Sequence, residues 1–182
     1  MDLITAIDTR ASAARIGEPA PTREHLERIL AAGSRPPDHG RLSPWRYVVL
    51  QGAALEVLAD AYVAIRRRQP PEPTAEQIEA ARKKAKRAPV IVVAAAHVVK
   101  GHRVPENEQV MAVAAGVQNM ILTAHALGYG TMWKTGEAAY DPEVKRVLGL
   151  EAEDHIVGFV YFGTTTQPGE VRPANLDHVR WI

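Results

Sequence analysis

Two arginines and a histidine lie close together in one short polar stretch, at Arg35, His39 and Arg41. Three prolines and two glycines stand between residues 33 and 44 of the same stretch. Proline fixes its own φ and restricts the residue before it, so the backbone here should be stiff. Guanidinium and imidazole groups bind anions through charge-assisted hydrogen bonds. The stretch therefore predicts a loop that holds donors in place for an anion or a cofactor.

A second group of donors, Arg10, Ala11 and Ser12, follows the first predicted helix. The guanidinium of Arg10 donates as a planar fork and the hydroxyl of Ser12 adds a neutral donor, a combination that suits a phosphate. The pattern is short, and a solvated surface turn often has the same residues. On these residues alone, the surface turn is the more common explanation.

Basic residues also run together at 82–87 and 66–68, which raises the question of nucleic-acid binding. Glu72, Glu76 and Glu79 lie between the two runs, and no aromatic side chain is interleaved with the run at 82–87. The formal net charge of the chain is only +1. A solvated helix face explains the basic runs better than a nucleic-acid partner does.

Several kinds of site are excluded or disfavoured by what the chain lacks. It has no cysteine, which excludes disulfides, iron–sulfur clusters and thiolate zinc sites. Its seven histidines form no HExxH pattern, and His97 and His102 stand at a strand end without carboxylates at metal spacing. We therefore expect no metal. A Gly-x-Ser-x-Gly elbow and a glycine-rich phosphate loop are also missing, which disfavours hydrolases and P-loop proteins.

Helix and strand signals alternate along the chain and must position these donors. We expect a short helix before Arg10, a helix capped by Thr22 that ends just before Gly33, and a helix over 53–68. A capping box at 74–77 and an Asp-Pro-Glu start at 141–143 predict two more. The longest helix should run from Pro105 to Leu127. Strands are expected at 45–50, 89–99, 129–135 and 155–163, the second of them covered on both faces.

Length and composition fit one α+β domain over residues 1–182, with 46% hydrophobic and 24% charged residues. The N-terminus lacks a basic region followed by an apolar run, and the apolar stretch 89–99 is too short to span a bilayer. We expect a cytoplasmic protein without a membrane partner. The final segment, 164–182, ends on Val179, Trp181 and Ile182. We expect this C-terminal extension to pack on a partner subunit.

The order of these motifs resembles the FMN-dependent nitroreductase family, closest to its short bacterial members. The shared motifs are Arg10-x-Ser12, Ala32-Gly33-x-Arg35-x-Pro37-x-His39 before Pro44-Trp45, Val104-Pro105, Gly128-Tyr129-Gly130-Thr131-Met132-Trp133-Lys134-Thr135-Gly136 and Ile156-Val157-Gly158-Phe159-Val160-Tyr161-Phe162-Gly163-Thr164. The resemblance covers nearly the whole chain. It implies a nitroreductase-like α+β fold, with a mostly antiparallel central sheet flanked by helices, a long central helix and a C-terminal extension.

The resemblance also implies a homodimer with two FMN molecules at the subunit interface. The positions that match the family's flavin contacts are Arg10, Ala11, Ser12, Arg35, His39, Thr131, Met132 and Trp133. Among them, Arg35 and His39 would reach the flavin of the partner subunit. The main chain near Thr135 and Gly136 would approach the flavin N5. The family's nicotinamide-nucleotide segment matches Ile121, Leu122, Thr123, Ala124, His125 and Ala126.

The implied activity is that of an FMN-dependent NAD(P)H oxidoreductase. NAD(P)H would deliver hydride to flavin N5 and leave, and a small acceptor such as a nitroaromatic or a quinone would then take the electrons. No protein residue is expected to act as nucleophile or acid–base catalyst, because the cofactor carries the chemistry.

The alternative is a flavin-binding protein without useful turnover, such as a sensor or storage protein. Ala14 favours that alternative, since many relatives carry a lysine or arginine there; Arg15 or Lys134 could replace the charge. The family pattern also includes a pair of basic residues near the C-terminus, for which Arg172 and Arg180 are the candidates.

Overall fold

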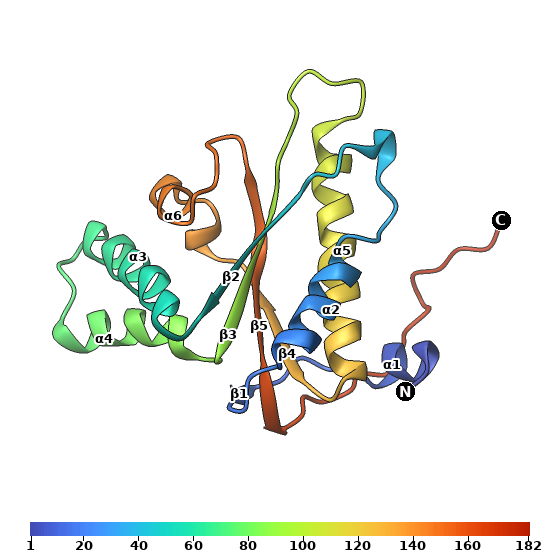
Figure 1. Cartoon of the computed structure of the whole chain (residues 1–182), viewed down its shortest axis with the longest axis horizontal. Helices are drawn as coiled ribbons and strands as arrows, with labels where there is room; N and C mark the ends of the chain where they lie inside the picture. The colour runs from blue at the N-terminus through green and yellow to red at the C-terminus, as the bar shows by residue number, and fades with distance from the viewer.

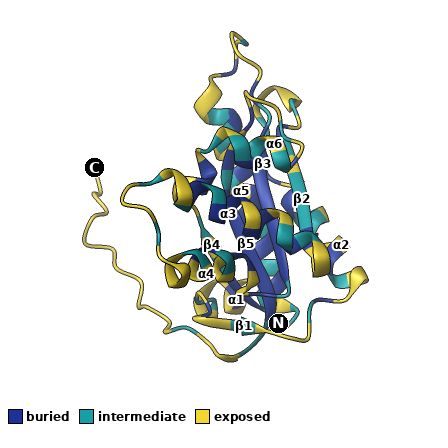
Figure 2. Ribbon diagram, turned by 90° about the vertical axis from the view of Figure 1, so that its left-hand side faces the viewer, coloured by how far each residue is buried: buried dark blue, intermediate teal, exposed yellow.

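The central strand of the molecule is β3 (Val90–Ala96), a run of seven apolar residues that are all fully buried. The computed structural model describes all 182 residues and places helices on both sides of this strand (Figure 2). Side chains alternate along β3, so Val90 and Val92 face one layer of helices while Ile91 and Val93 face the other. A strand covered on both faces was expected at 89–99, and the structure confirms it within narrower bounds.

The sheet has five strands and every pairing in it is antiparallel. Strands β2 (Trp45–Gln51) and β5 (His155–Gln167) flank β3. Two shorter strands, β1 (Arg15–Gly17) and β4 (Gly130–Lys134), both pair with β5. These pairings confirm the α+β class with an antiparallel central sheet (Figure 1).

One face of the sheet is covered by α5 (Glu106–Ala126), the longest helix, together with α2 (Arg23–Gly33). The short helix α1 (Leu3–Thr9) contacts α5 (Figure 1). Buried apolar side chains from α2, α5 and the sheet form one core cluster, which includes Ile29, Val113 and Met120. No helix combines the length and the apolar composition that crossing a lipid bilayer requires.

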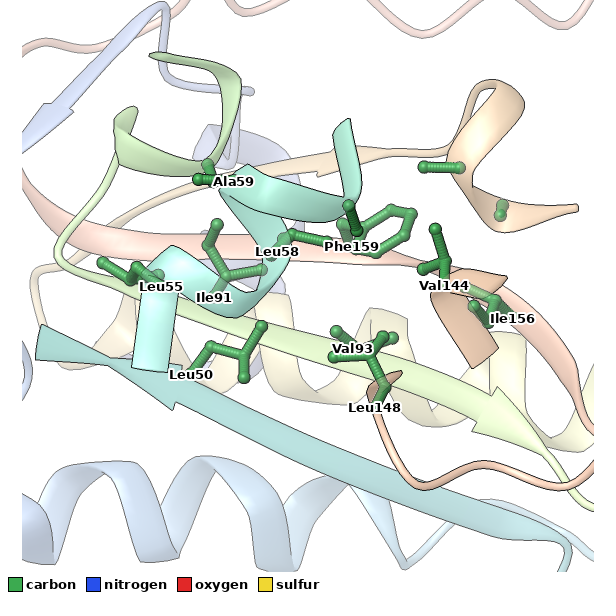
Figure 3. Close-up of a cluster of buried hydrophobic side chains, with 14 of the residues drawn as sticks. Leu50, Leu55, Leu58, Ala59, Ile91, Val93, Val144, Leu148, Ile156 and Phe159 are labelled. Carbon is green, nitrogen blue, oxygen red and sulfur yellow. The ribbon is translucent and has the colours of Figure 1, made fainter. Parts of the chain in front are cut away.

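The other face carries α3 (Leu55–Arg68) and α6 (Pro142–Val147), with α4 (Ala75–Lys83) packed against α3. Figure 3 shows the core beneath them, where side chains of α3 and α6 meet those of β3 and β5. The labelled residues are Leu50, Leu55, Leu58, Ala59, Ile91, Val93, Val144, Leu148, Ile156 and Phe159. The two core clusters hold the sheet between two layers of helices.

The predicted helix starts are confirmed by their capping hydrogen bonds. The Thr22 hydroxyl accepts from the His25 backbone N–H at 3.2 Å. Thr74 and Gln77 form the expected capping box, and the Asp141 carboxylate accepts from two backbone N–H groups at the start of α6. These local bonds need only neighbouring residues, which is why the sequence reveals them.

Two sequence-based boundaries are wrong, and one strand was not predicted. Gly33 does not follow α2 but ends it, and a Cβ there would lie 2.8 Å from Cγ of Met120 on α5. Gly33 is therefore needed for close helix packing and not for a left-handed cap. Strand β1 was not expected, because three residues carry no periodicity. Finally, β5 extends to Gln167 through its pairing with β1, so the C-terminal extension begins at Pro168 and not at Thr164.

The half-buried Tyr47 side chain of β2 contacts α2, and its ionisation can be used to test this contact. Its hydroxyl donates to the Gly33 carbonyl oxygen at 2.7 Å, and burial raises the pKa of Tyr47 from its ordinary value of 10.0 to about 12. A folded pKa above the unfolded one contributes stability that is complete below pH 10 and is lost as the pH rises toward 12.

We expect Tyr47→Phe to cost about 1 kcal/mol below pH 10 through the lost hydrogen bond. Above pH 10, stability should fall less steeply in the variant than in the wild type, because the variant lacks this titrating group. Urea unfolding of both proteins across this range measures the difference. Parallel alkaline losses in the two proteins would show that Tyr47 does not contribute.

Candidate functional site

The segment after α1 brings Arg10, Ala11 and Ser12 to the beginning of β4. The Ala13 backbone N–H donates to the Thr131 carbonyl oxygen at 2.8 Å, which ties the segment to the strand. Ala13 is buried, which anchors the segment. Ser12 is exposed, so its hydroxyl is accessible to a ligand. The backbone of the predicted donor group is therefore anchored to the sheet beside an accessible hydroxyl.

The C-terminal extension closes this site from the other side. Gly169 packs on the segment so closely that an added Cβ would lie 3.0 Å from the Ser12 carbonyl carbon and 3.2 Å from the Ala11 Cβ. This contact carries Arg172 into a hollow of about 470 Å³ that Arg10 and Ser12 also line. We call it the oxyanion hollow; its lining residues are Ile7, Asp8, Arg10, Ala11, Ser12, Glu170, Val171 and Arg172.

The oxyanion hollow offers two guanidinium groups and one hydroxyl at a single place. Two guanidinium forks and a hydroxyl can saturate the oxygens of a phosphate. Asp8 and Glu170 also line the hollow, yet neither forms an ion pair with Arg10 or Arg172. Of the two C-terminal candidates, Arg172 is the one that reaches this hollow, while Arg180 lies on the exposed end of the chain.

The last turn of α5 lies beside the same hollow. The Thr9 hydroxyl and Nε2 of His125 are 2.9 Å apart, and partial burial together with the nearby charge of Arg10 lowers the pKa of His125. Within the segment 121–126, Ile121 and Ala124 are buried in the core. The remaining side chains of the segment are half-buried or, for Ala126, exposed.

Strand β4 continues from the oxyanion hollow and carries Thr131, Met132 and Trp133. Thr131 is buried and Met132 packs against the α3 side of the core. Nε1 of Trp133 donates to the Val157 carbonyl oxygen at 3.2 Å. Trp133 lies against Gly158, where an added Cβ would be 2.6 Å from the indole Cδ1. Because Gly158 has no side chain, the Trp133 indole fits against it while remaining partly exposed.

A small hollow of about 30 Å³ lies farther along β4 and along the segment that follows Ser12. Its lining includes Ala14, Arg87, Met132 and Lys134. Lys134 and Arg87 line this hollow together, and burial, with the charge of Arg87, lowers the pKa of Lys134. Lys134, one of the two candidates for the charge expected at Ala14, therefore lies at the same hollow as Ala14. Arg87, which is exposed, was missed, because the run 82–87 gives no sign of which member lines this hollow.

Two other residues of the basic run at 82–87 form ion pairs on the protein surface. Arg82 pairs with Glu56 and Asp60, and Lys86 also pairs with Glu56. These exposed pairs each contribute little to stability. Arg82 and Lys86 therefore have carboxylate partners within the chain.

The loop that carries Arg35 and His39 is held rigid, as its prolines indicate. Nδ1 of His39 lies 2.6 Å from a Glu108 carboxylate oxygen in the first turn of α5. The Asp38 carboxylate accepts from the Ser43 backbone N–H at 2.7 Å, and Ser43 itself has a φ of 49°. A non-glycine residue in the left-handed region is uncommon and often marks a ligand-binding segment.

The two predicted donor groups stand at opposite ends of α5. The His39 side chain is hydrogen-bonded to Glu108 in the first turn of α5. Thr9, which precedes Arg10, is hydrogen-bonded to His125 in the last turn of the same helix. These positions are seventeen residues apart on one helix, which is about 25 Å at the rise of an α-helix. One copy of the chain therefore does not bring Arg10 and His39 to one small ligand.

The expectation that His97 has no carboxylate nearby is wrong. Nδ1 of His97 lies 2.8 Å from the Asp154 carboxylate, and a Glu151 oxygen lies 3.7 Å from the same nitrogen. Asp154 is buried, and its other oxygen accepts from the Glu151 backbone N–H at 2.9 Å. Both carboxylate oxygens are thus satisfied, so the group closes the turn before β5. Sequence spacing missed it because His97 and Asp154 are far apart in the chain.

Solved structures share this architecture over the full chain. A nitroreductase-like family protein from Bacillus cereus superposes with a TM-score of 0.85 at 21% identity, covering 100% of this chain and 96% of that one. A nitroreductase with bound FMN from Bacteroides fragilis NCTC 9343 superposes with a TM-score of 0.78 at 19% identity, covering 100% and 99%. The chain therefore has the nitroreductase-like fold.

Sequence comparison narrows this to a family. The Nitroreductase family model matches residues 17–164. The chain is also 37% identical over 168 residues to "Putative NAD(P)H nitroreductase YdjA" of Escherichia coli strain K12, covering 90% of this chain and 88% of that protein. This protein belongs to the nitroreductase family.

Proposed function

We propose that this protein is a flavin oxidoreductase that binds FMN and passes electrons from NAD(P)H to small electron-poor acceptors such as nitroaromatics and quinones. The observation that carries the proposal is the oxyanion hollow, where Arg10, Ser12 and Arg172 converge. The family of the chain and the FMN in the Bacteroides fragilis relative support a flavin phosphate as the anion.

The residues present fit such a cofactor. Arg10, Ser12 and Arg172 would hold the phosphate, and the Ala11 and Gly169 contact would fix the backbone around it. Thr131, Met132 and Trp133 would lie along the flavin, since β4 leads away from the oxyanion hollow in the direction of the small hollow.

The chain's own contribution to the chemistry is binding and charge. Bound FMN supplies the redox chemistry, taking hydride from NAD(P)H and giving electrons to the acceptor. Lys134 and Arg87, beside Ala14, would stabilise negative charge near the flavin ring. This pair supports turnover over flavin binding alone, because the surroundings of Ala14 carry positive charge.

The test uses the purified protein loaded with FMN under anaerobic conditions. We expect yellow protein with flavin absorbance, bleaching by NADH or NADPH, and recovery of the absorbance on addition of a nitroaromatic or quinone. Protein that takes up no FMN would contradict the whole proposal. Protein that binds FMN but is not bleached would instead be the sensor or storage protein.

We also propose that the FMN site is shared between two copies of the chain. An exposed apolar surface includes Leu3, Ile4 and Ile7 of α1, which are 65%, 64% and 50% exposed. Met111 of α5 is exposed as well, and α1, α5 and the C-terminal extension lie on the same side of the molecule (Figure 1). Large exposed apolar surfaces mark protein interfaces.

Antiparallel contact of α5 with α5 of a second copy would bring the two donor groups together. The first turn of one helix would then lie beside the last turn of the other, so His39 and Arg35 of one subunit would meet Arg10 and Ser12 of its partner. The C-terminal extension would pack on the partner as well, since it ends in exposed apolar residues.

Mixed dimers test this sharing directly. In a dimer of one Arg10→Ala chain and one Arg35→Ala chain, sharing leaves one site intact and one doubly damaged. We expect one tightly bound FMN per mixed dimer, and weak binding in dimers of either variant alone. Two differently tagged chains allow the mixed dimer to be isolated and its flavin counted. If Arg35 serves its own subunit, mixing will restore no site.

Binding of the nicotinamide nucleotide by residues 121–126 stays a prediction, and burial restricts it to part of this segment. Ile121 and Ala124 are buried in the core, so only Leu122, Thr123, His125 and Ala126 are placed to meet a ligand. A contact there would lie beside the oxyanion hollow, through His125.

A further inference from the structure

A third hollow, of about 250 Å³, opens beside the end of β4 and carries a marked excess of positive charge. We call it the basic hollow. Four cationic side chains line it, Arg66, Lys84, Arg87 and Lys134, against the single carboxylate of Glu137. The Glu137 carboxylate already accepts from Nε2 of Gln69 at 2.5 Å.

Three of these cations have no counter-ion. Lys84, Arg87 and Lys134 have no carboxylate oxygen within 4.0 Å, although Lys86, in the same basic run, is paired with Glu56. Arg66, by contrast, is held by hydrogen bonds to the Gln69 carbonyl and the Gln77 side chain. Like charges held together without a partner repel each other, and a bound anion relieves the repulsion.

The floor of the basic hollow is aromatic and neutral. Tyr62 and Tyr161 both line it, and burial raises the pKa of each phenol, so both keep their protons. Tyr62 is further fixed by an edge-on contact with Phe159, with ring centroids 6.1 Å apart. A flat aromatic ligand with one negative group matches this combination of aromatic floor and cationic wall.

The basic hollow is continuous in its lining with the proposed flavin site. Arg87, Lys134 and Tyr161 line both the basic hollow and the small hollow beside Ala14. Thr135 and Gly136, which follow β4, line the basic hollow as well. An acceptor bound there would lie next to the cofactor and not at a remote surface.

We propose that the basic hollow binds the carboxylate of the electron acceptor, so that the preferred acceptors are small aromatic acids. This inference rests on the proposed function, because it names the acceptor class of that same site. The volume is slightly below the usual range of about 300–1,000 Å³ for ligand pockets, which limits the acceptor to about one aromatic ring.

The reaction can be written for 4-nitrobenzoate, which carries both a reducible group and a carboxylate. One NAD(P)H and one proton supply two electrons and two protons to the nitro group. One N–O bond breaks, and the products are NAD(P)⁺, 4-nitrosobenzoate and water. The carboxylate is unchanged, so it serves only for binding.

Two probes separate the binding site from the activity. Benzoate has the carboxylate but no reducible group, so its binding to the FMN-loaded protein by calorimetry does not depend on turnover. The pair 4-nitrobenzoate and 4-nitrobenzamide differs only in charge, so the ratio of their kcat/KM values measures recognition of that charge. We expect the acid to be favoured by about tenfold, as one charge-assisted hydrogen bond provides.

Three variants assign the effect to residues. Lys84→Met changes a residue of the basic hollow that does not line the small hollow, Arg87→Met changes one that lines both, and Lys83→Met is the matched control. Lys83 is exposed and approaches Glu79 at 3.7 Å on the outer face of α4. We expect about tenfold weaker benzoate binding in the first two variants and none of this loss in the control.

The outcomes are distinct. Loss of benzoate binding in Lys84→Met, with FMN affinity unchanged, supports the proposal even if no acceptor is reduced, in which case the proposed function alone fails. Equal kcat/KM values for the acid and the amide in the wild-type protein overturn the proposal. So does unchanged benzoate binding in Lys84→Met and Arg87→Met, above all if Arg87→Met loses FMN, because the cations would then serve only the cofactor.

Discussion

Gly116→Ala should strongly lower the stability of this protein. A Cβ at Gly116 of α5 would overlap the Gly33 carbonyl oxygen of α2 and lie 2.7 Å from the Tyr47 hydroxyl. That carbonyl is backbone and already accepts the Tyr47 hydrogen bond, so neither neighbour can move without breaking a contact. Overpacking of this kind costs about 3 kcal/mol or more when backbone must shift.

Urea unfolding of the FMN-free protein at fixed concentration measures the loss, and Gly17→Ala is the matched control. Gly17 has open space around its Cβ position and does not need a left-handed backbone. We expect that control to stay within about 0.5 kcal/mol of the wild type. Adding Tyr47→Phe to Gly116→Ala should recover only part of the loss, because the overlap with Gly33 remains. Equal stability of the two alanine variants would show that α2 and α5 can separate freely.

Arg10→Ala should weaken FMN binding by about 10- to 100-fold, the range expected when a charged hydrogen-bond donor is removed. Arg10 is one of two guanidinium groups in the oxyanion hollow, so its removal would leave only Arg172 of the same subunit to neutralise the phosphate. Quenching of FMN fluorescence on titration with protein measures the affinity. The difference from the wild type should shrink as salt is added, because the lost interaction is between charges.

Riboflavin and Arg15→Ala provide the controls for this prediction. Riboflavin has no phosphate, so its affinity should be nearly the same in the wild type and in Arg10→Ala. Arg15 is exposed and follows the site by only a few residues, and its loss should leave FMN binding intact. An equal loss of riboflavin affinity in Arg10→Ala would mean that Arg10 shapes the fold of the segment and does not bind the phosphate.

Much of the fold can be predicted from the sequence because its strongest signals are local. Seven consecutive apolar residues in β3 require cover on both faces, and the helix starts at Thr22, Thr74 and Asp141 are set by side chains within three residues. By contrast, β1 exists only through its pairing with β5. Gly33 shows the same limit, since its role depends on Met120 in a helix far along the chain.

The candidate site likewise contains some residues that the sequence predicts and others that only the folded chain reveals. The donors Arg10 and Ser12 stand out in the sequence and through the family resemblance, and the structure places them in one hollow. Which C-terminal arginine joins them depends on the path of the extension past Gly169, which no local pattern encodes. Arg87 is likewise one of several identical-looking basic residues, and only the turn after α4 directs it to Lys134.

The length of α5 has a consequence for how this protein acquires its cofactor. Because the helix keeps its two donor groups about 25 Å apart, a single subunit presents only half of each proposed FMN site. Subunit association and FMN binding would then be linked by mass action, each raising the apparent affinity of the other. Dilution should release flavin from the wild-type protein, and excess FMN should hold the subunits together at concentrations where they would otherwise separate.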